Sequence, residues 1–163
     1  MESNILGSHS KRVYYEAVYR EGGTELWREE IGNLVPSAAL DAGLDSIYGG
    51  TGFTAYVALV SGTPTFAAAD TLASHSGWTE ATNYSGNRPA VTWAAASGGV
   101  KSNTNNPVSI TFSSSGVIGG IALVSATSGT SGLLDSEAAF GTAQTVAASG
   151  VLDIVASVTA TTA

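Results

Sequence analysis

The chain has 163 residues, no cysteine and a formal net charge of -7, and charged residues make up only 12% of its composition. This length can bury a core without metals or disulfides, and the missing cysteines exclude disulfide bonds and thiolate metal sites. The acidic balance opposes binding to nucleic acid or anionic membranes, because both rely on Lys and Arg. We therefore expect neither partner, and a surface so poor in charge predicts that part of it is covered in use.

The N-terminal segment predicts a flexible leader followed by a β-hairpin. Residues 1–12 are mostly small and polar, with no periodicity. Residues 13–19 are rich in aromatic and β-branched side chains, Gly22 and Gly23 suit a tight turn, and residues 24–28 can return as a second strand. We expect this hairpin to be an arm that stands apart from the main domain.

Aromatic residues of this hairpin are candidate interface residues. Tyr15 and Tyr19 share one face of a strand, whereas Tyr14 lies on the opposite face. Only one face can pack on the chain's own core, and aromatic residues and Arg are enriched at interface centres. Contact between subunits through Tyr14, Tyr15, Tyr19, Trp27 and Arg28 is therefore favoured, and a lid packed on the same chain is the alternative.

A short α-helix is predicted over residues 36–48. Pro36 suits an early helical position, and Leu40, Leu44 and Ile47 fall on one helical face before Gly49 ends the segment. We expect the helix to lie over a sheet edge or the bottom of a sandwich, so that residues 13–50 form the arm and helix.

Residues 51–163 predict the main domain, an all-β fold of the β-sandwich or jelly-roll type. Turn signals recur every 8 to 12 residues or so, which favours many short antiparallel strands. The adjacent glycines at 119 and 120 predict a bulge or a close backbone approach. A short helical turn is expected near residues 70–75. The predicted strands cover residues 54–61, 90–95, 99–104, 108–113, 117–125, 132–139, 143–147 and 150–159.

Few residues in this domain could carry chemistry. His75 is the only histidine outside the leader, and no Gly-x-Ser-x-Gly elbow frames a nucleophile. The spacing of Asp70, His75 and Glu80 matches no metal-ligand pattern, so we read Asp70 as a cap and Glu80 as solvated. We expect no catalytic residue, metal or cofactor and no enzymatic activity, with His75, Trp78 and Arg88 as loop anchors.

Two stretches of this domain carry a family resemblance. Residues 70–80 read DTLASHSGWTE, and Tyr84 is followed by RPAVTW at 88–93 and ASGG at 96–99. Together with ELWREE at 25–30, they resemble small virion proteins of tailed bacteriophages. The resemblance spans most of residues 13–160 and implies a β-sandwich or jelly-roll that decorates or cements the capsid.

The function implied by this resemblance is that of a non-enzymatic capsid decoration protein, made in the host cytoplasm and carried on the outer surface of the virion. Its expected partners are the major capsid protein and sister copies in a homo-oligomer. The alternative is a tail or tail-fibre module that binds host carbohydrate, for which Trp78, Tyr84 and Trp93 are the candidate stacking residues.

Overall fold

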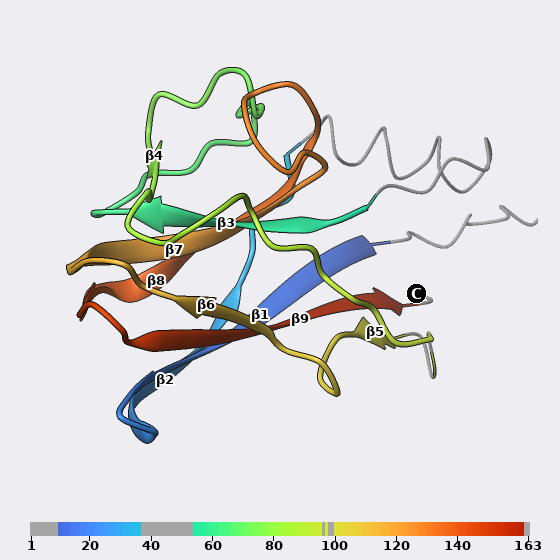
Figure 1. The fold of residues 1–163 in the computed structure, drawn as a ribbon. Coiled ribbons are helices and arrows are strands. Elements are labelled where there is room, and N and C mark those ends of the chain that lie inside the picture. Colours follow the sequence, from blue (N-terminus) through green and yellow to red (C-terminus); the bar gives the residue numbers. More distant parts are fainter. Residues whose placement is uncertain (1–9, 37–53, 96, 98–99, 162–163) are drawn as a thin grey trace, which may run out of the picture.

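The fold is a β-sandwich, and the sequence-based prediction of an all-β protein is confirmed. The computed structural model describes residues 10–36, 54–95, 97 and 100–161. Its nine strands form two antiparallel sheets that lie face to face, and the described residues contain no helix (Figure 1).

The five-stranded sheet joins the two ends of the described chain. Its strands are β1 (Ser10–Glu21), β2 (Thr24–Gly32), β5 (Val100–Ser102), β6 (Val108–Thr111) and β9 (Val151–Thr161). They follow the order β2-β1-β9-β5, and β6 also pairs with β9. Strands β1 and β9 are antiparallel and in register from Ser10 opposite Thr161 to Arg20 opposite Val151. The first strand therefore lies inside the sheet, between β2 and β9.

The four-stranded sheet has the order β4-β3-β7-β8. Its strands are β3 (Tyr56–Ser61), β4 (Thr79–Glu80), β7 (Gly116–Val124) and β8 (Leu134–Val146). The register of β7 and β8 breaks between Ile118, opposite Gln144, and Gly120, opposite Ala139. This irregularity lies where the sequence predicts a gap between two strands, yet β8 continues through it as one strand.

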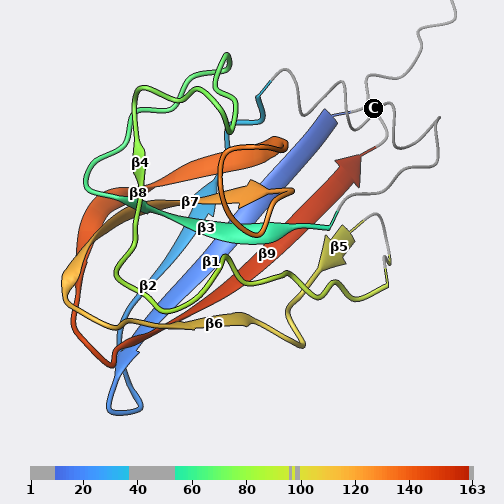
Figure 2. The same cartoon turned by 45° about the horizontal axis from the view of Figure 1, so that its top comes forward.

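Two clusters of apolar side chains hold the layers together. The main core lies between the sheets and includes Tyr15 and Leu152 from one sheet and Leu59 and Ile121 from the other. A second core lies on the far side of the four-stranded sheet, under residues 62–78. Figure 2 shows this segment on the side of β3 away from β9, and Figure 1 shows the loop after β7 on the same side as the segment. The second core contains Ala58, Val60, Leu72, Trp78, Ala122, Val124 and Leu134.

Several sequence-based expectations are corrected by the structure. The hairpin forms, but it is part of the sandwich because β1 pairs with β9, so it is not a separate arm. Strand β1 begins at Ser10, within the expected leader. Residues 70–75 form no helical turn: the backbones of Thr71 and Ser74 exchange hydrogen bonds of 3.0 and 3.1 Å. Residues 90–95 form no strand beyond a bridge at Ala90.

The helix predicted over residues 36–48 falls almost entirely outside the described residues. Of residues 36–48, only Pro36 is among the described residues, where it is buried and not in a helix or strand. The rest of that prediction lies outside the described residues.

Candidate functional site

Among the expected interface residues, Tyr15, Tyr19 and Trp27 pack against their own chain. Tyr15 and Tyr19 are each 1% exposed, and the Tyr15 hydroxyl is hydrogen-bonded to that of Ser136. Burial raises the pKa of Tyr15. Trp27 is half-buried, stacked on Tyr19 at 5.5 Å between ring centroids and edge-on to Phe140 at 5.6 Å. These residues therefore form an intrachain lid, and the prediction that they face another subunit is corrected.

The hydroxyl group of Tyr19 fixes the end of the hairpin. It accepts a hydrogen bond from the backbone N–H of Ala147 at 2.7 Å and donates one to the Glu21 carboxylate at 2.8 Å. The ring packs in the main core, so the phenol joins β1 to the turn between β8 and β9.

Tyr14 and Arg28 lie on the other side of the hairpin. We call this side of the five-stranded sheet, which is turned away from the four-stranded sheet, the outer face. Tyr14 is 44% exposed, and alternation along β1 puts Glu16 and Arg20 on the same side. Arg28 is exposed and stands opposite Val18 in the register of β1 and β2. Two of the five expected interface residues are thus accessible.

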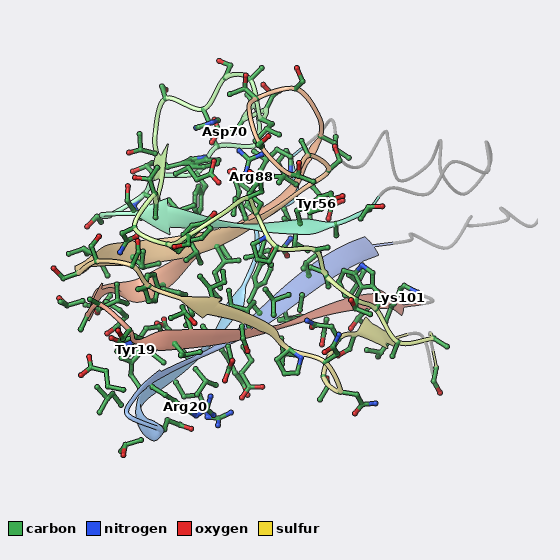
Figure 3. All side chains as sticks on the ribbon, viewed as in Figure 1. Tyr19, Arg20, Tyr56, Asp70, Arg88 and Lys101 are labelled. Carbon is green, nitrogen blue, oxygen red and sulfur yellow. The ribbon has the colours of Figure 1, made fainter. Side chains whose placement is uncertain are left out.

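Ion pairs cross the outer face from β2 to β9. Arg28 pairs with Glu16 and, at 3.0 Å, with Glu25. Arg20 lies 3.6 Å from Glu25 and pairs with Asp153 on β9. Figure 3 shows Arg20 on the side of the molecule away from the four-stranded sheet. The network connects three neighbouring strands, and it holds these long side chains in defined positions.

A shallow groove of about 420 Å³ lies beside this network. Tyr14 and Val155 supply apolar surface to it, and Ser157 and Thr104 supply hydroxyl groups. Glu16 and Glu30, which also line it, stand opposite one another on β1 and β2. The groove therefore combines an accessible aromatic ring with two carboxylates.

Arg88 is held by two separate segments. It is 7% exposed, and its guanidinium donates two hydrogen bonds to Glu80, at 2.7 and 2.6 Å. It also donates to the carbonyl oxygens of Ala126, at 3.0 Å, and Gly129, at 2.9 Å. Glu80 is thus not simply solvated as predicted. The hydrogen bonds to Glu80 raise the pKa of Arg88, so the guanidinium is charged at any ordinary pH.

His75 and Trp78 pack on one another in the segment over the four-stranded sheet. Their rings are stacked with centroids 3.7 Å apart, and His75 Nδ1 lies 3.2 Å from the Trp78 carbonyl oxygen. Phe66 meets the indole edge-on at 6.1 Å, and Trp78 is only 6% exposed. Trp78 therefore offers no free ring face to a sugar. Trp93 and Tyr84 are partly buried against the main core.

A buried acidic residue that sequence reasoning missed lies beneath Trp78. Glu137 on β8 is 0% exposed, and its Oε2 accepts a hydrogen bond of 3.1 Å from the indole N–H of Trp78. Asp70 is buried beside it and, together with burial itself, raises the pKa of Glu137 to about 7. The signal in the sequence was a pair of acidic residues, Asp135 and Glu137, in a strand of mostly small and apolar residues.

These groups do not assemble a recognisable catalytic or metal centre. Within the described ranges, no group of three or more His, Cys, Asp or Glu side chains could hold a metal ion. In the same residues, no helix is long and apolar enough to span a membrane. No family model and no curated protein matches this chain. The outer face brings together an accessible tyrosine ring, a network of ion pairs and a groove.

Proposed function

We propose that this protein is a non-enzymatic virion protein of a tailed bacteriophage, which decorates the outer capsid surface and stabilises the shell. Its partners would be the major capsid protein and sister copies. The resemblance of residues 70–80 and 84–99 to small virion proteins supports the class, and the all-β sandwich agrees with the fold that this resemblance implies.

The observation that carries the proposal is the accessibility of Tyr14 on the outer face. The tyrosine is 44% exposed although it belongs to β1, a strand flanked by β2 and β9. Tyrosine and arginine are among the residue types that most often dominate binding energy at the centre of an interface. Tyr14, together with Arg28, which stands opposite Val18 further along the same face, is therefore the centre of the proposed contact.

The ion pairs on the outer face favour a preorganised contact. Arg28 and Arg20 are already held by Glu16, Glu25 and Asp153 in the isolated chain. A partner that docks here pays less entropy for ordering side chains than it would on a surface of free ones. A specific contact needs about 800 Å² from each partner, and repetition over a symmetric shell makes modest contacts collectively strong.

The test is binding to purified heads that lack this protein. Tyr14→Ala and Arg28→Glu should each weaken binding about tenfold or more, because each removes a central contact of the outer face. Val117→Ala is the matched control, since Val117 is 45% exposed on β7 of the other sheet and should leave binding unchanged. Heads that do not bind the wild-type protein, or that gain no resistance to heat from it, would contradict the proposal.

A second candidate function is that of a tail or fibre module that binds carbohydrate. One observation favours it: a groove of about 330 Å³ lies between residues 84–89 and β6, lined by Tyr84, Asn87, Ser109 and Thr111 among others. Neutral hydroxyl and amide groups beside an aromatic ring suit a sugar. Immunogold labelling at the tail tip, with saturation-transfer NMR signals from host polysaccharide that Tyr84→Ala abolishes, would favour this function over capsid decoration.

A further inference from the structure

Two carboxyl groups meet at the contact between residues 62–78 and the four-stranded sheet. Glu137 stands opposite Ala122 in the register of β7 and β8, so it points into the second core with Ala122. Asp70 belongs to residues 62–78, which we call the cover segment. Figure 3 shows Asp70 on the far side of the four-stranded sheet from β1 and β9.

The hydrogen bonds at this contact leave one position open. Glu137 Oε2 accepts from Trp78 Nε1 at 3.1 Å, and Asp70 Oδ2 accepts from the backbone N–H of Ala67 at 3.1 Å. Glu137 Oε1 is buried and has no hydrogen-bond partner. A proton on Glu137 would turn this oxygen into a donor toward Asp70, whereas two ionised carboxylates would repel one another without solvent to screen them.

We propose that the buried Asp70–Glu137 pair is a pH-dependent lock, which holds the cover segment on the four-stranded sheet while the pair carries a proton and loosens when the proton is lost. This lock lies in the second core and involves no residue of the outer face.

The direction of the pH dependence follows from Glu137. Burial and the negative charge of Asp70 raise its pKa from 4.5 to about 7 in the closed state. An open state, in which water reaches the carboxyl group, has a pKa near the lower value. Between these two values the closed state binds one proton more than the open state, so opening becomes about tenfold easier for each pH unit. Opening then levels off above the higher value.

The effects of other titratable groups near the pair must be distinguished from the effect of the pair itself. His75 is stacked on the Trp78 ring with centroids 3.7 Å apart, so it is the histidine of the cover segment that the test must control. Asp135 precedes Glu137 by two residues on β8, and Tyr15 faces β8 from the main core, where burial keeps it neutral. Among the described residues, these are the groups to control.

Opening would expose apolar surface that the closed state hides. Leu72 and Trp78 of the cover segment are 1% and 6% exposed. They cover Val60, Ala122 and Val124 of the sheet, each of which is 0% exposed. The lock therefore controls access to the second core and leaves the main core closed.

Hydrogen exchange of backbone amides, corrected for intrinsic rates, tests the lock on the whole protein. The reporters are the amides of Thr65, bonded to Gly77 at 2.9 Å, and of Ser74, bonded to Thr71 at 3.1 Å. Between about pH 5.5 and 7, their opening constant should rise about tenfold per pH unit, while the amides of β9 keep their protection. A flat profile at the reporters, or a parallel change throughout β9, would overturn the proposal.

Variants assign the effect to the pair. Glu137→Gln keeps a side-chain oxygen for Trp78 and an N–H₂ donor for Asp70, so its opening constant should not change with pH. Asp70→Asn removes the charge that faces Glu137 but leaves Glu137 buried, so it should weaken the pH dependence without abolishing it, and it serves where Glu137→Gln does not fold. Glu25→Gln, an exposed carboxylate on the outer face, and His75→Gln should keep the wild-type profile. A pH dependence that survives in Glu137→Gln or disappears in His75→Gln would overturn the proposal. Restoration of the closed state at high pH by millimolar calcium would also overturn it, because the two carboxylates would then act as a cation site and not as a proton-dependent lock.

Discussion

At the scale of single residues, Arg88 holds together loops that are far apart in the sequence. Its guanidinium donates four hydrogen bonds, two to the Glu80 carboxylate and two to carbonyl groups of the loop after β7. The Arg88 side chain is 5% exposed and that of Glu80 is 27% exposed, so the pair is only partly screened by water. One side chain thus joins two loops that are about 40 residues apart.

Replacing Arg88 should cost much of the stability of the fold. Arg88→Ala leaves the Glu80 carboxylate and two carbonyl groups without donors, and we expect a loss of about 3 kcal/mol in the free energy of unfolding. Arg88→Lys keeps the charge but not the forked geometry and should cost about half as much. Urea denaturation followed by tryptophan fluorescence measures both. A loss below about 1 kcal/mol for Arg88→Ala would contradict this account.

The sequence predicted single residues well only where local alternation decides their environment. Tyr14 and Tyr15 were assigned to opposite faces, and they are 44% and 1% exposed. In contrast, the environments of Glu80 and Glu137 depend on partners brought together by the fold, Arg88 and Trp78. From sequence alone a carboxylate is predicted to be solvated, because its partner in the fold is not visible in the local pattern. That prediction was wrong for Glu80.

At the scale of elements, β7 shows how two glycines permit a close approach of backbones. A Cβ atom on Gly119 would overlap the carbonyl oxygen of Gly62 and lie 2.6 Å from Pro64 Cδ. A Cβ atom on Gly120 would overlap the carbonyl oxygen of Ala138 on β8. The register also breaks at this point, so the prediction of a bulge or close approach at these glycines is confirmed.

Gly119→Ala should therefore destabilise the sandwich. The clash is with backbone atoms and cannot be relieved by a rotamer change, so we expect a cost of about 3 kcal/mol, the upper end for overpacking a core. Gly32→Ala on β2 is the matched control, because the nearest atom to its added Cβ is Tyr14 Cε1 at 4.0 Å. That variant should be neutral or more stable by up to about 1 kcal/mol. Equal urea midpoints for the two variants would contradict the assignment of Gly119 to a tight contact.

The elements that sequence reasoning placed best are those bounded by clear turn signals. Residues 54–61, 108–113, 117–125 and 150–159 were predicted as strands and correspond to β3, β6, β7 and β9. The hairpin was also predicted, but its role was not, because pairing with β9 is a property of residues about 140 positions away. Local pattern defines a strand, whereas only the completed fold decides its neighbour.

At the scale of the whole molecule, the adjacency of the first and last strands organises the sandwich. Strand β1 pairs with β2 on one side and with β9 on the other, so the hairpin is held in the five-stranded sheet from both ends of the chain. The outer face therefore belongs to a rigid sheet and not to a mobile arm. A contact centred on Tyr14 would use the sandwich itself as its support.

This adjacency predicts that the chain can be circularly permuted. Ser10 stands opposite Thr161, so a short Gly/Ser linker can join these two residues as a new hairpin. New ends can be opened between Gly22 and Gly23, which are exposed in a turn where both residues have positive φ, 56° and 84°. Every strand pairing is kept, and the difference in loop-closure entropy is small, so the permutant should fold with a free energy of unfolding within about 1 to 2 kcal/mol of the parent.

Opening the same linked chain between Gly119 and Gly120 instead cuts β7 where it is buried, and that permutant should not fold. Far-UV circular dichroism and urea midpoints distinguish the outcomes, and an unfolded permutant at Gly22 would mean that the hairpin turn, and not the pairing of β1 with β9, holds the five-stranded sheet together.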